Sequence, residues 1–341
     1  MQRRWGSPDA ATAAVRHAVR ATLTDLTSAP NRSAPAVVPG DLVLVACSGG
    51  ADSLALAAAA AFEAPAAGCR AGAVVVDHAL QPGSAQVSAD AARRLRDLGL
   101  DPVEVLAVEV TASGEGLEAA AREARYAALE EAADRHDASA VLLGHTLDDQ
   151  AEQVLLGLTR GAGARSLSGM PARRDRFRRP LLGVSRAQCR ASVRAQGLEW
   201  WDDPMNQDRA FTRVRARRAL ADLERDLGPG VAAALARTAS LLREDADHLD
   251  ALADAAVTVL GPQPWPVGEL TGIPRAVRTR VWRRLLIAAG APAGQVGARH
   301  TDACDRLLTA WHGQGPVHAP GDLRLARSAG WVTIDPADPV D

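Results

Sequence analysis

The chain has 341 residues, 47% of them hydrophobic, and a formal net charge of −2. This length and apolar content suit a large buried core and predict two domains, which excludes an intrinsically disordered chain. No apolar run reaches the roughly 18 residues that cross a bilayer, and the first residues lack the apolar segment of a secretory signal. The sequence therefore predicts a cytoplasmic protein with no membrane partner.

The cysteines exclude several kinds of site. The four of them, Cys47, Cys69, Cys189 and Cys304, are scattered and form no C-x-x-C pair. A structural zinc site, an iron–sulfur cluster or a disulfide framework needs a denser or paired arrangement. We therefore expect the cysteines to be small core residues.

The first 39 residues are predicted to form an N-terminal extension. They are rich in Ala, Ser, Thr and Pro. A short helix is expected over residues 12–26, followed by a flexible, proline-containing link over residues 29–39.

A strand, a glycine turn and a helix follow the extension. An apolar run over residues 42–47 predicts the strand, and an alanine-rich run over residues 54–61 predicts the helix. The residues between them are Ser48, Gly49, Gly50, Ala51, Asp52 and Ser53. Glycines bring backbone N–H groups against an anion, and the start of the helix adds positive charge, so this turn predicts a phosphate site. The alternative is an ordinary strand-to-helix connection.

The carboxylate of Asp52 predicts that a divalent cation binds at the same loop. Phosphates would repel the carboxylate unless a divalent ion bridged them, so the loop indicates Mg²⁺ as well as a nucleotide. A Walker loop is excluded because the chain contains no lysine, and all 39 Lys+Arg residues are arginine.

Strands and helices alternate after the loop. Strands are predicted over residues 71–77, 102–108 and 138–144, and helices over 84–98, 117–135 and 146–158, with Ser84 as a helix cap. This alternation predicts an α/β fold with a doubly wound parallel sheet, whose ligands bind beyond the carboxyl ends of the strands.

Polar residues follow two more of these strands. Asp77 and His78 end the second, and His145, Asp148, Asp149 and Glu152 follow the fourth. Asp149 and Glu152 are three residues apart and share a helix face, with Asp148 one position away. These acids could simply complement the helix dipole. Because three loops converge on one edge of the sheet, we favour a catalytic or magnesium-binding role, with Asp52 and Asp148 as the magnesium ligands.

A basic segment covers residues 160–218. It holds fifteen arginines and five acidic residues, a local net charge of +10. Such a segment is a candidate polyanion-binding face, although the arginines could instead be solvated or pair with the acidic N-terminal half. Arg213, Arg215 and Arg217 alternate, so they would share one face of an extended segment and suit phosphates along an RNA backbone.

Residues 221–341 predict a smaller, mainly helical domain. Helices are expected over residues 229–260, 277–289 and 301–311, and a hairpin over residues 317–334.

Several motifs carry a family resemblance. The loop Ser48–Ser53 resembles the pyrophosphate-binding (PP-loop) signature of ATP pyrophosphatases. Further motifs lie at residues 76–80, 118–126, 144–152, 160–163, 167–170, 179–182, 201–208 and 211–217. In the order and spacing of these motifs, across about residues 41–220, the sequence resembles the tRNA(Ile)-lysidine synthetases. One departure is Val214, where relatives often have Asn.

The resemblance implies a fold, a reaction and partners. It implies an adenine nucleotide α-hydrolase-like catalytic domain over residues 40–220 and a small tRNA-docking domain over residues 221–341. The C2 oxygen of the wobble cytidine in the CAU anticodon of tRNA(Ile) would attack the α-phosphate of ATP. The amine of free L-lysine would then displace AMP, which gives lysidine and changes decoding from AUG to AUA.

We assign roles to residues on this basis. ATP would be bound by the loop Ser48–Ser53 together with Asp77, His78 and His145. Asp149 and Glu152 would hold the lysine ammonium, and one of them would take its proton. Arg122 or Arg125 would bind the lysine carboxylate or the activated phosphate, and the other of the two is expected to pair with Glu118 or a neighbouring acid. The tRNA would be contacted by Arg160, Arg213, Arg215 and Arg217.

Two other functions stay open at this point. One is a small-molecule synthetase that uses the same loop but has no need of the basic segment. The other is a non-catalytic nucleotide-binding stress protein, which has no need of the Asp149 and Glu152 pair. A homodimer is also left open.

Overall fold

The computed structural model describes residues 8–28, 40–78, 81, 83–108, 117–161 and 163–337. The predicted flexible link over residues 29–39 lies outside them. Two compact units divide between Leu241 and Leu242, which lies beyond the boundary that the sequence predicts after residue 220. Each unit is described by itself. No helix in the described ranges combines the length and the apolar character needed to cross a membrane.

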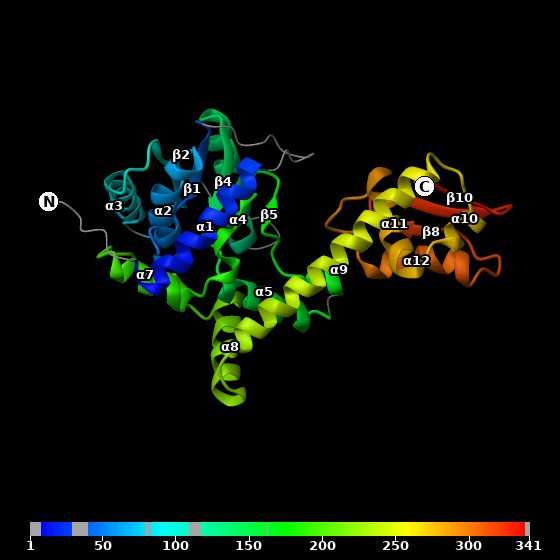
Figure 1. Cartoon of the computed structure of the whole chain (residues 1–341). Coiled ribbons are helices and arrows are strands. Elements are labelled where there is room, and N and C mark those ends of the chain that lie inside the picture. The colour runs from blue at the N-terminus through cyan, green and yellow to red at the C-terminus, as the bar shows by residue number, and fades with distance from the viewer. Residues whose placement is uncertain are drawn as a thin grey trace. The chain divides into compact units, whose positions relative to one another are not determined.

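The first unit is built on a six-stranded sheet in the order β3-β2-β1-β4-β6-β5 (Figure 1). The strands are β1 (Leu42–Ala46), β2 (Arg70–Asp77), β3 (Val103–Ala107), β4 (Ala138–Leu143), β5 (Arg173–Arg174) and β6 (Phe177–Arg178). All neighbours are parallel except β5 and β6, which form an antiparallel hairpin at one edge. The predicted doubly wound sheet is confirmed.

The helices of this unit connect the strands. They are α1 (Ala10–Ser28), α2 (Ala51–Glu63), α3 (Ser84–Asp97), α4 (Leu117–Arg135), α5 (Leu147–Thr159), α6 (Ala164–Leu167), α7 (Arg186–Ala195) and α8 (Thr212–Leu227). Three short 3-10 turns are η1 (Pro65–Ala67), η2 (Pro180–Gly183) and η3 (Pro204–Gln207). Each predicted helix is present, but Gly83 rather than Ser84 occupies the N-cap of α3.

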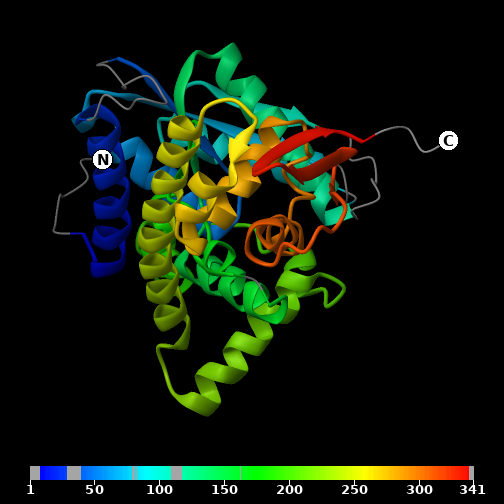
Figure 2. The same ribbon diagram turned by 90° about the vertical axis from the view of Figure 1, so that its right-hand side faces the viewer.

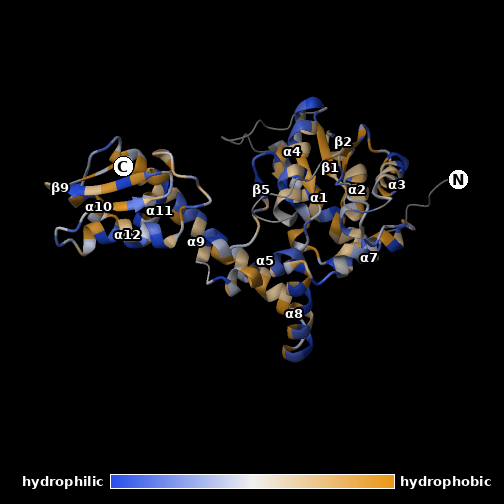
Figure 3. Cartoon of the chain, turned by 180° about the vertical axis from the view of Figure 1, so that it is seen from behind, coloured by the Kyte–Doolittle hydropathy of each residue, from blue (hydrophilic) through white to orange (hydrophobic). Residues whose placement is uncertain are grey.

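Alternating side chains of the sheet bury into two apolar layers. Val43 and Val45 of β1 pack with residues of α1, α2 and α7, whereas Leu42 and Leu44 pack with residues of α4. The hydropathy colours in Figure 3 show this core on the strands and the helices beside them, and hydrophilic residues along α8. All four cysteines are buried, as expected of core residues. Both faces of the sheet are therefore covered, which is typical of parallel sheets.

The chain changes direction between β1 and β4. From β1 the strand order proceeds to β2 and then β3 on one side, and β4 pairs with β1 on the opposite side. This is the switch point beside which doubly wound sheets bind ligands. A Cβ atom on Gly144, directly after β4, would lie 3.1 Å from Cα of Ser53. Only glycine therefore lets the end of β4 approach the first turn of α2 this closely.

The second unit packs helices against an antiparallel sheet (Figure 2). It contains most of the long helix α9 (Val231–Leu260), then α10 (Val267–Gly272), α11 (Arg275–Ala288) and α12 (Ala298–Thr309). The sheet has the order β7-β10-β9-β8, with β7 (Trp265–Pro266), β8 (Val317–Ala319), β9 (Leu323–Ser328) and β10 (Trp331–Pro336). The predicted helices are present, and the predicted hairpin is part of this four-stranded sheet.

Candidate functional site

The glycine loop between β1 and α2 has the predicted strand–turn–helix form. Gly49 has φ of +80°, a left-handed conformation that glycine adopts without strain. The Ser53 hydroxyl accepts a hydrogen bond from the backbone N–H of Ser48 at 3.2 Å and donates one to the carbonyl of Gly50 at 3.0 Å. The loop is therefore closed on itself at the N-terminus of α2, where anions bind.

A distant segment fixes the outer side of this loop. The backbone N–H of Trp201 donates to the carbonyl of Gly49 at 3.0 Å. Nearby, Asp203 accepts hydrogen bonds from the side chain of Gln81 and the backbone of Met205, both at 2.9 Å. The segment that begins at Trp201 thus lies directly against the loop, although about 150 residues separate them in the sequence.

Three predicted site acids meet around one guanidinium that the sequence analysis did not single out. In Arg186, at the start of α7, Nη2 lies 2.8 Å from Oδ1 of Asp149 and 3.2 Å from Oε1 of Glu152. Its Nε lies 3.5 Å from Oδ2 of Asp52. The side chain of Arg186 is only 16% exposed. The loop, α5 and α7 are therefore joined through one largely buried cation.

Helix caps hold this cluster in place. Asp149 closes a capping box with Thr146, whose backbone N–H donates to Oδ2 of Asp149 at 2.8 Å. Asp148 faces α7, because its Oδ2 accepts a hydrogen bond from the backbone N–H of Arg186 at 2.7 Å. Glu152 also accepts from Nε of Arg217 at 2.9 Å. Asp149 and Glu152 share a face as predicted, and Asp148 lies off it.

Burial and charge set the protonation of these groups. Burial raises the pKa of Asp52 to about 6, which Arg186 partly opposes and Asp149 reinforces. Burial also opposes ionisation of Asp149, but Arg186 and the hydrogen bond from the Thr146 backbone bring the pKa of Asp149 below its ordinary value. Desolvation disfavours the charged form of Arg186, yet the acids around it raise its pKa. The negative charge of Asp52 is therefore less well compensated than that of Asp149.

Four buried polar atoms near the carboxyl ends of the parallel strands have no hydrogen-bond partner. They are Oδ1 of Asp52, Oε2 of Glu152, Nδ1 of His78 and Nδ1 of His145. Burial lowers the pKa of both histidines, to about 3 for His145, so both rings are neutral near pH 7. Unsatisfied buried polar atoms are unfavourable unless a ligand completes them, so these atoms mark a binding site. Among the described residues, no group of three or more His, Cys, Asp or Glu residues is arranged to hold a metal by itself.

A cluster of arginines borders the site. Arg122 and Arg125 on α4 have no ion pair with any carboxylate of the described residues, and the side chain of Glu118 lies outside that description. Burial lowers the pKa of both arginines, and the neighbouring Arg179 and Arg213 lower it further. Guanidinium groups that repel one another in this way favour a bound anion.

The predicted extended face of arginines is wrong. Residues 212–227 form helix α8, in which Arg213 and Arg217 are one turn apart and Arg215 points elsewhere. Arg215 donates to the carbonyls of Arg209 and Ala210 at 2.7 and 2.8 Å. Arg217 binds Glu152. The helix forms because apolar positions at helical spacing are buried, and this outweighs the period-two pattern of charge.

Arg160 lies at the end of α5 opposite to Asp149. It is exposed at the C-terminal cap of α5, eleven residues beyond Asp149. That spacing places it roughly 16 Å along the helix from Asp149.

Comparisons with known proteins agree with this geometry. A family profile of the PP-loop domain matches residues 22–224. The tRNA(Ile)-lysidine synthase of Thermobifida fusca is 54% identical over 330 residues, covering 96% of this chain and 98% of its own. That of Streptomyces coelicolor is 51% identical, covering 96% and 99%, and that of Leifsonia xyli is 52% identical, covering 90% and 93%.

A solved structure supports the fold. The U34-tRNA thiolase NcsA from Methanococcus maripaludis, with its 4Fe-4S cluster, has a TM-score of 0.54 and 17% sequence identity. The match covers 68% of this chain and 80% of that chain. Because the identity is low, the likeness shows the shared fold alone. The PP-loop match and the similarity to curated relatives over almost the whole chain show that the chain belongs to the tRNA(Ile)-lysidine synthase family of PP-loop proteins.

Proposed function

We propose that the protein ligates lysine to C2 of the wobble cytidine in the CAU anticodon of tRNA(Ile), with ATP converted to AMP and diphosphate. The product, lysidine, pairs with A rather than G, so the codon read changes from AUG to AUA. The observation that carries the proposal is the acid cluster of Asp52, Asp149 and Glu152 beside the PP-loop. It supports an ammonium-bearing substrate next to ATP in a member of this family.

The first step is adenylylation of the cytidine. The C2 oxygen forms a bond to the α-phosphorus of ATP, and the bond to the β-phosphate oxygen breaks and releases pyrophosphate. The backbone N–H groups of Ser48–Ser53 and the N-terminus of α2 stabilise the charge that develops on the leaving oxygen. Asp77 and His78 at the end of β2, and His145 after β4, lie on the two strands that flank β1 and complete the ATP site, with both histidines as neutral hydrogen-bonding groups.

Asp52 suits a magnesium ion. Mg²⁺ in nucleotide sites is held by one or two carboxylates together with phosphate oxygens, and Oδ1 of Asp52 is buried without a partner. Asp148 suits it less, because one of its oxygens already accepts the backbone N–H of Arg186. When bound, the ion would draw negative charge from the phosphates.

The second step transfers lysine. Asp149 pairs with Arg186, and Oε1 of Glu152 pairs with Arg186 and Arg217. Oε2 of Glu152 is buried without a partner, so it can accept a hydrogen bond from one substrate ammonium. One of Asp149 and Glu152 takes a proton from the ammonium. The amine then forms a bond to C2, and AMP leaves with the C2 oxygen.

The arginines of α4 provide the anion site. Arg122 and Arg125 lack carboxylate partners among the described residues, so they can bind the lysine carboxylate or the activated phosphate. Arg217 acts through Glu152, and Arg160, Arg213 and Arg215 remain candidates for tRNA contacts. We assign docking of the tRNA body to the second unit, and we place the enzyme in the cytoplasm with its RNA and ATP.

Labelled lysine tests the proposal. Purified protein is incubated with ATP, Mg²⁺, labelled lysine and a tRNA(Ile) transcript that carries CAU, with the CAU-bearing tRNA(Met) transcript as control. We expect label on the isoleucine transcript alone and none with Asp52→Ala. Absence of label on both transcripts, while ATP still binds, would contradict the proposal and favour a small-molecule acceptor.

A further inference from the structure

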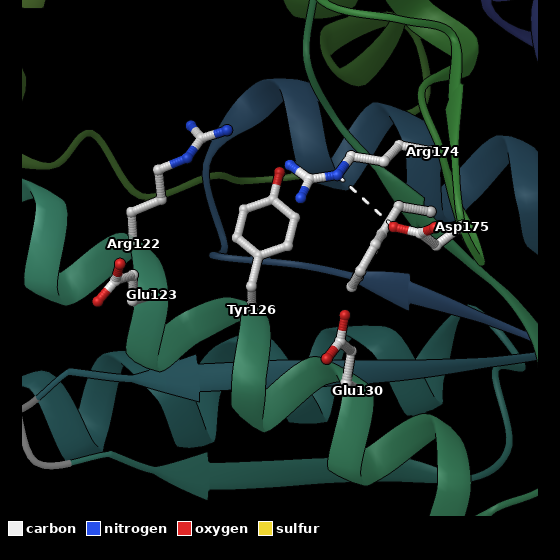
Figure 4. Close-up of a pocket in the computed structure, with 7 residues that line it drawn as sticks. Arg122, Glu123, Tyr126, Glu130, Arg174 and Asp175 are labelled. Carbon is white, nitrogen blue, oxygen red and sulfur yellow. Dashed lines mark ion pairs between the residues drawn. The ribbon is translucent and has the colours of Figure 1, made fainter. Parts of the chain in front are cut away.

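A pocket lies between α4 and the β5–β6 hairpin, outside the acid cluster. Its volume is about 360 Å³, within the range of small-ligand sites. Figure 4 shows Tyr126 between Arg122 and Arg174, with Glu130 farther along α4. Arg122, Tyr126 and Glu130 are four residues apart, so a cation, an aromatic ring and an acid follow one another along a single face of the helix.

The aromatic wall of the pocket is held firmly. The rings of Tyr126 and Phe177 meet edge to face with centroids 4.9 Å apart, and Phe177 is buried. The Tyr126 hydroxyl accepts a hydrogen bond from Nη2 of Arg179 at 3.1 Å. Cζ of Arg122 lies 5.1 Å from the centre of the Tyr126 ring. A planar ligand would therefore meet an ordered ring and a guanidinium plane.

The polar lining suits both ends of a nucleotide. Nε of Arg174 lies 3.6 Å from Oδ2 of Asp175 in an exposed ion pair, which leaves the outer nitrogens of Arg174 for a phosphate (Figure 4). Arg122 can bind the same phosphate, and it belongs to the cationic cluster that borders the candidate active site. Glu123, Glu130 and Asp175 supply carboxylates, which only accept hydrogen bonds and therefore select a ligand with N–H donors. A free phosphate or an acidic ligand would be repelled by these three acids.

We infer that this pocket holds the nucleobase that follows the wobble cytidine in the RNA substrate. The inference rests on the proposed function, which makes the substrate a CAU anticodon loop and this base an adenine. Proteins read single-stranded RNA loops by stacking splayed bases on aromatic rings or guanidinium planes and by hydrogen bonds to the base edges. The exocyclic amino group of adenine can donate a hydrogen bond to Glu130, because Asp175 already pairs with Arg174 (Figure 4).

Binding of an anticodon stem-loop RNA tests this assignment. The dissociation constant is measured for a stem-loop with adenine at this position and for one with unsubstituted purine, which lacks the amino group. We expect the unaltered protein to bind the adenine loop about tenfold more tightly. Arg174→Ala should weaken binding of both loops roughly tenfold, and Glu130→Ala should remove the preference for adenine.

The neighbouring residues provide matched controls. Arg173→Ala changes the same hairpin, and Glu131→Ala changes the same helix, but neither residue lines the pocket. For both control variants, the dissociation constants of the two loops should lie within twofold of those of the unaltered protein. Thermal melting and ATP binding of all four variants report on folding.

The outcomes separate this inference from the proposed function. Pocket variants that bind both loops like their controls would overturn the inference, as would an unaltered protein that does not distinguish adenine from purine. Lysine incorporation is measured in parallel with the unaltered protein. If lysine is incorporated but the protein does not distinguish adenine from purine, only the pocket assignment is wrong. If the protein distinguishes the two bases but does not incorporate lysine, only the proposed reaction is wrong.

Discussion

Arg186 is the residue on which the acid cluster depends. Asp52, Asp149 and Glu152 come from two separate segments, and all three lie within 3.5 Å of its guanidinium. Buried carboxylates this close would raise one another's pKa and drive protonation if no cation lay between them. With Arg186 present, Asp149 stays ionised and can hold an ammonium.

Replacing Arg186 should therefore change both stability and pH dependence. Arg186→Gln leaves buried carboxylates uncompensated, so we expect a loss of roughly 3 kcal/mol in the free energy of unfolding. The pKa of Asp149 should rise, so the acid limb of lysine transfer should move to higher pH and the KM for lysine should increase. Urea unfolding and a pH profile measure these effects. Arg190→Gln, at an exposed arginine of the same helix, is the control, and equal behaviour of the two variants would contradict this role.

Asp52 should make the ligand-free protein less stable as the pH rises. The folded protein keeps the Asp52 proton up to about pH 6, whereas the unfolded chain loses it near 3.8. The folded state thus binds more protons between these values, and stability falls across this window by at most about 3 kcal/mol. Asp52→Asn should therefore be more stable than the unaltered protein at pH 7.5 and about equal to it at pH 4. Urea unfolding at both pH values measures this, and a difference that does not depend on pH would refute it.

At the scale of elements, the close contact between β4 and α2 positions the PP-loop. A Cβ atom at position 144 would lie 3.1 Å from Cα and 3.2 Å from N of Ser53, and backbone atoms cannot move aside as a flexible side chain can. We expect Gly144→Ala to destabilise the fold by about 1–3 kcal/mol and to weaken ATP binding. Gly183→Ala, where a Cβ meets nothing within 4 Å, is the control. Thermal melting and ATP titration that gave equal results for both variants would show that the contact is unimportant.

The sequence predicts the elements well wherever apolar spacing determines them. The strand before the loop, the alanine-rich helix α2 and the long helix α9 all follow from burial periodicity. The alternating arginines were misleading, because the spacing of charged residues says little about backbone conformation. Strand β7 has only two residues and leaves no periodic signal. Thus the hairpin could be predicted, but the four-stranded sheet could not.

At the scale of the whole molecule, the sequence predicts where the site lies on the sheet, but it does not predict which site residues pair with one another. Parallel strands bring the loop Ser48–Ser53, His78 and Asp149 to one edge of the sheet, and topology alone requires this. The pairing of Arg186 with the acids and the seating of Trp201 on Gly49 depend on contacts between distant segments. A single sequence carries no local signal for such contacts.

The central claim is that the PP-loop and the Asp149–Glu152 face serve separate steps of one reaction. ATP labelled at the α-phosphate and lysine carrying a second label are supplied together with the tRNA(Ile) transcript. Glu152→Gln keeps the loop intact but weakens the ammonium site, so we predict α-phosphate label on the RNA and at least tenfold less lysine label than with the unaltered protein. Asp52→Asn should give neither label. If Glu152→Gln lost both labels to the same extent, or transferred lysine normally, this division of roles would be contradicted.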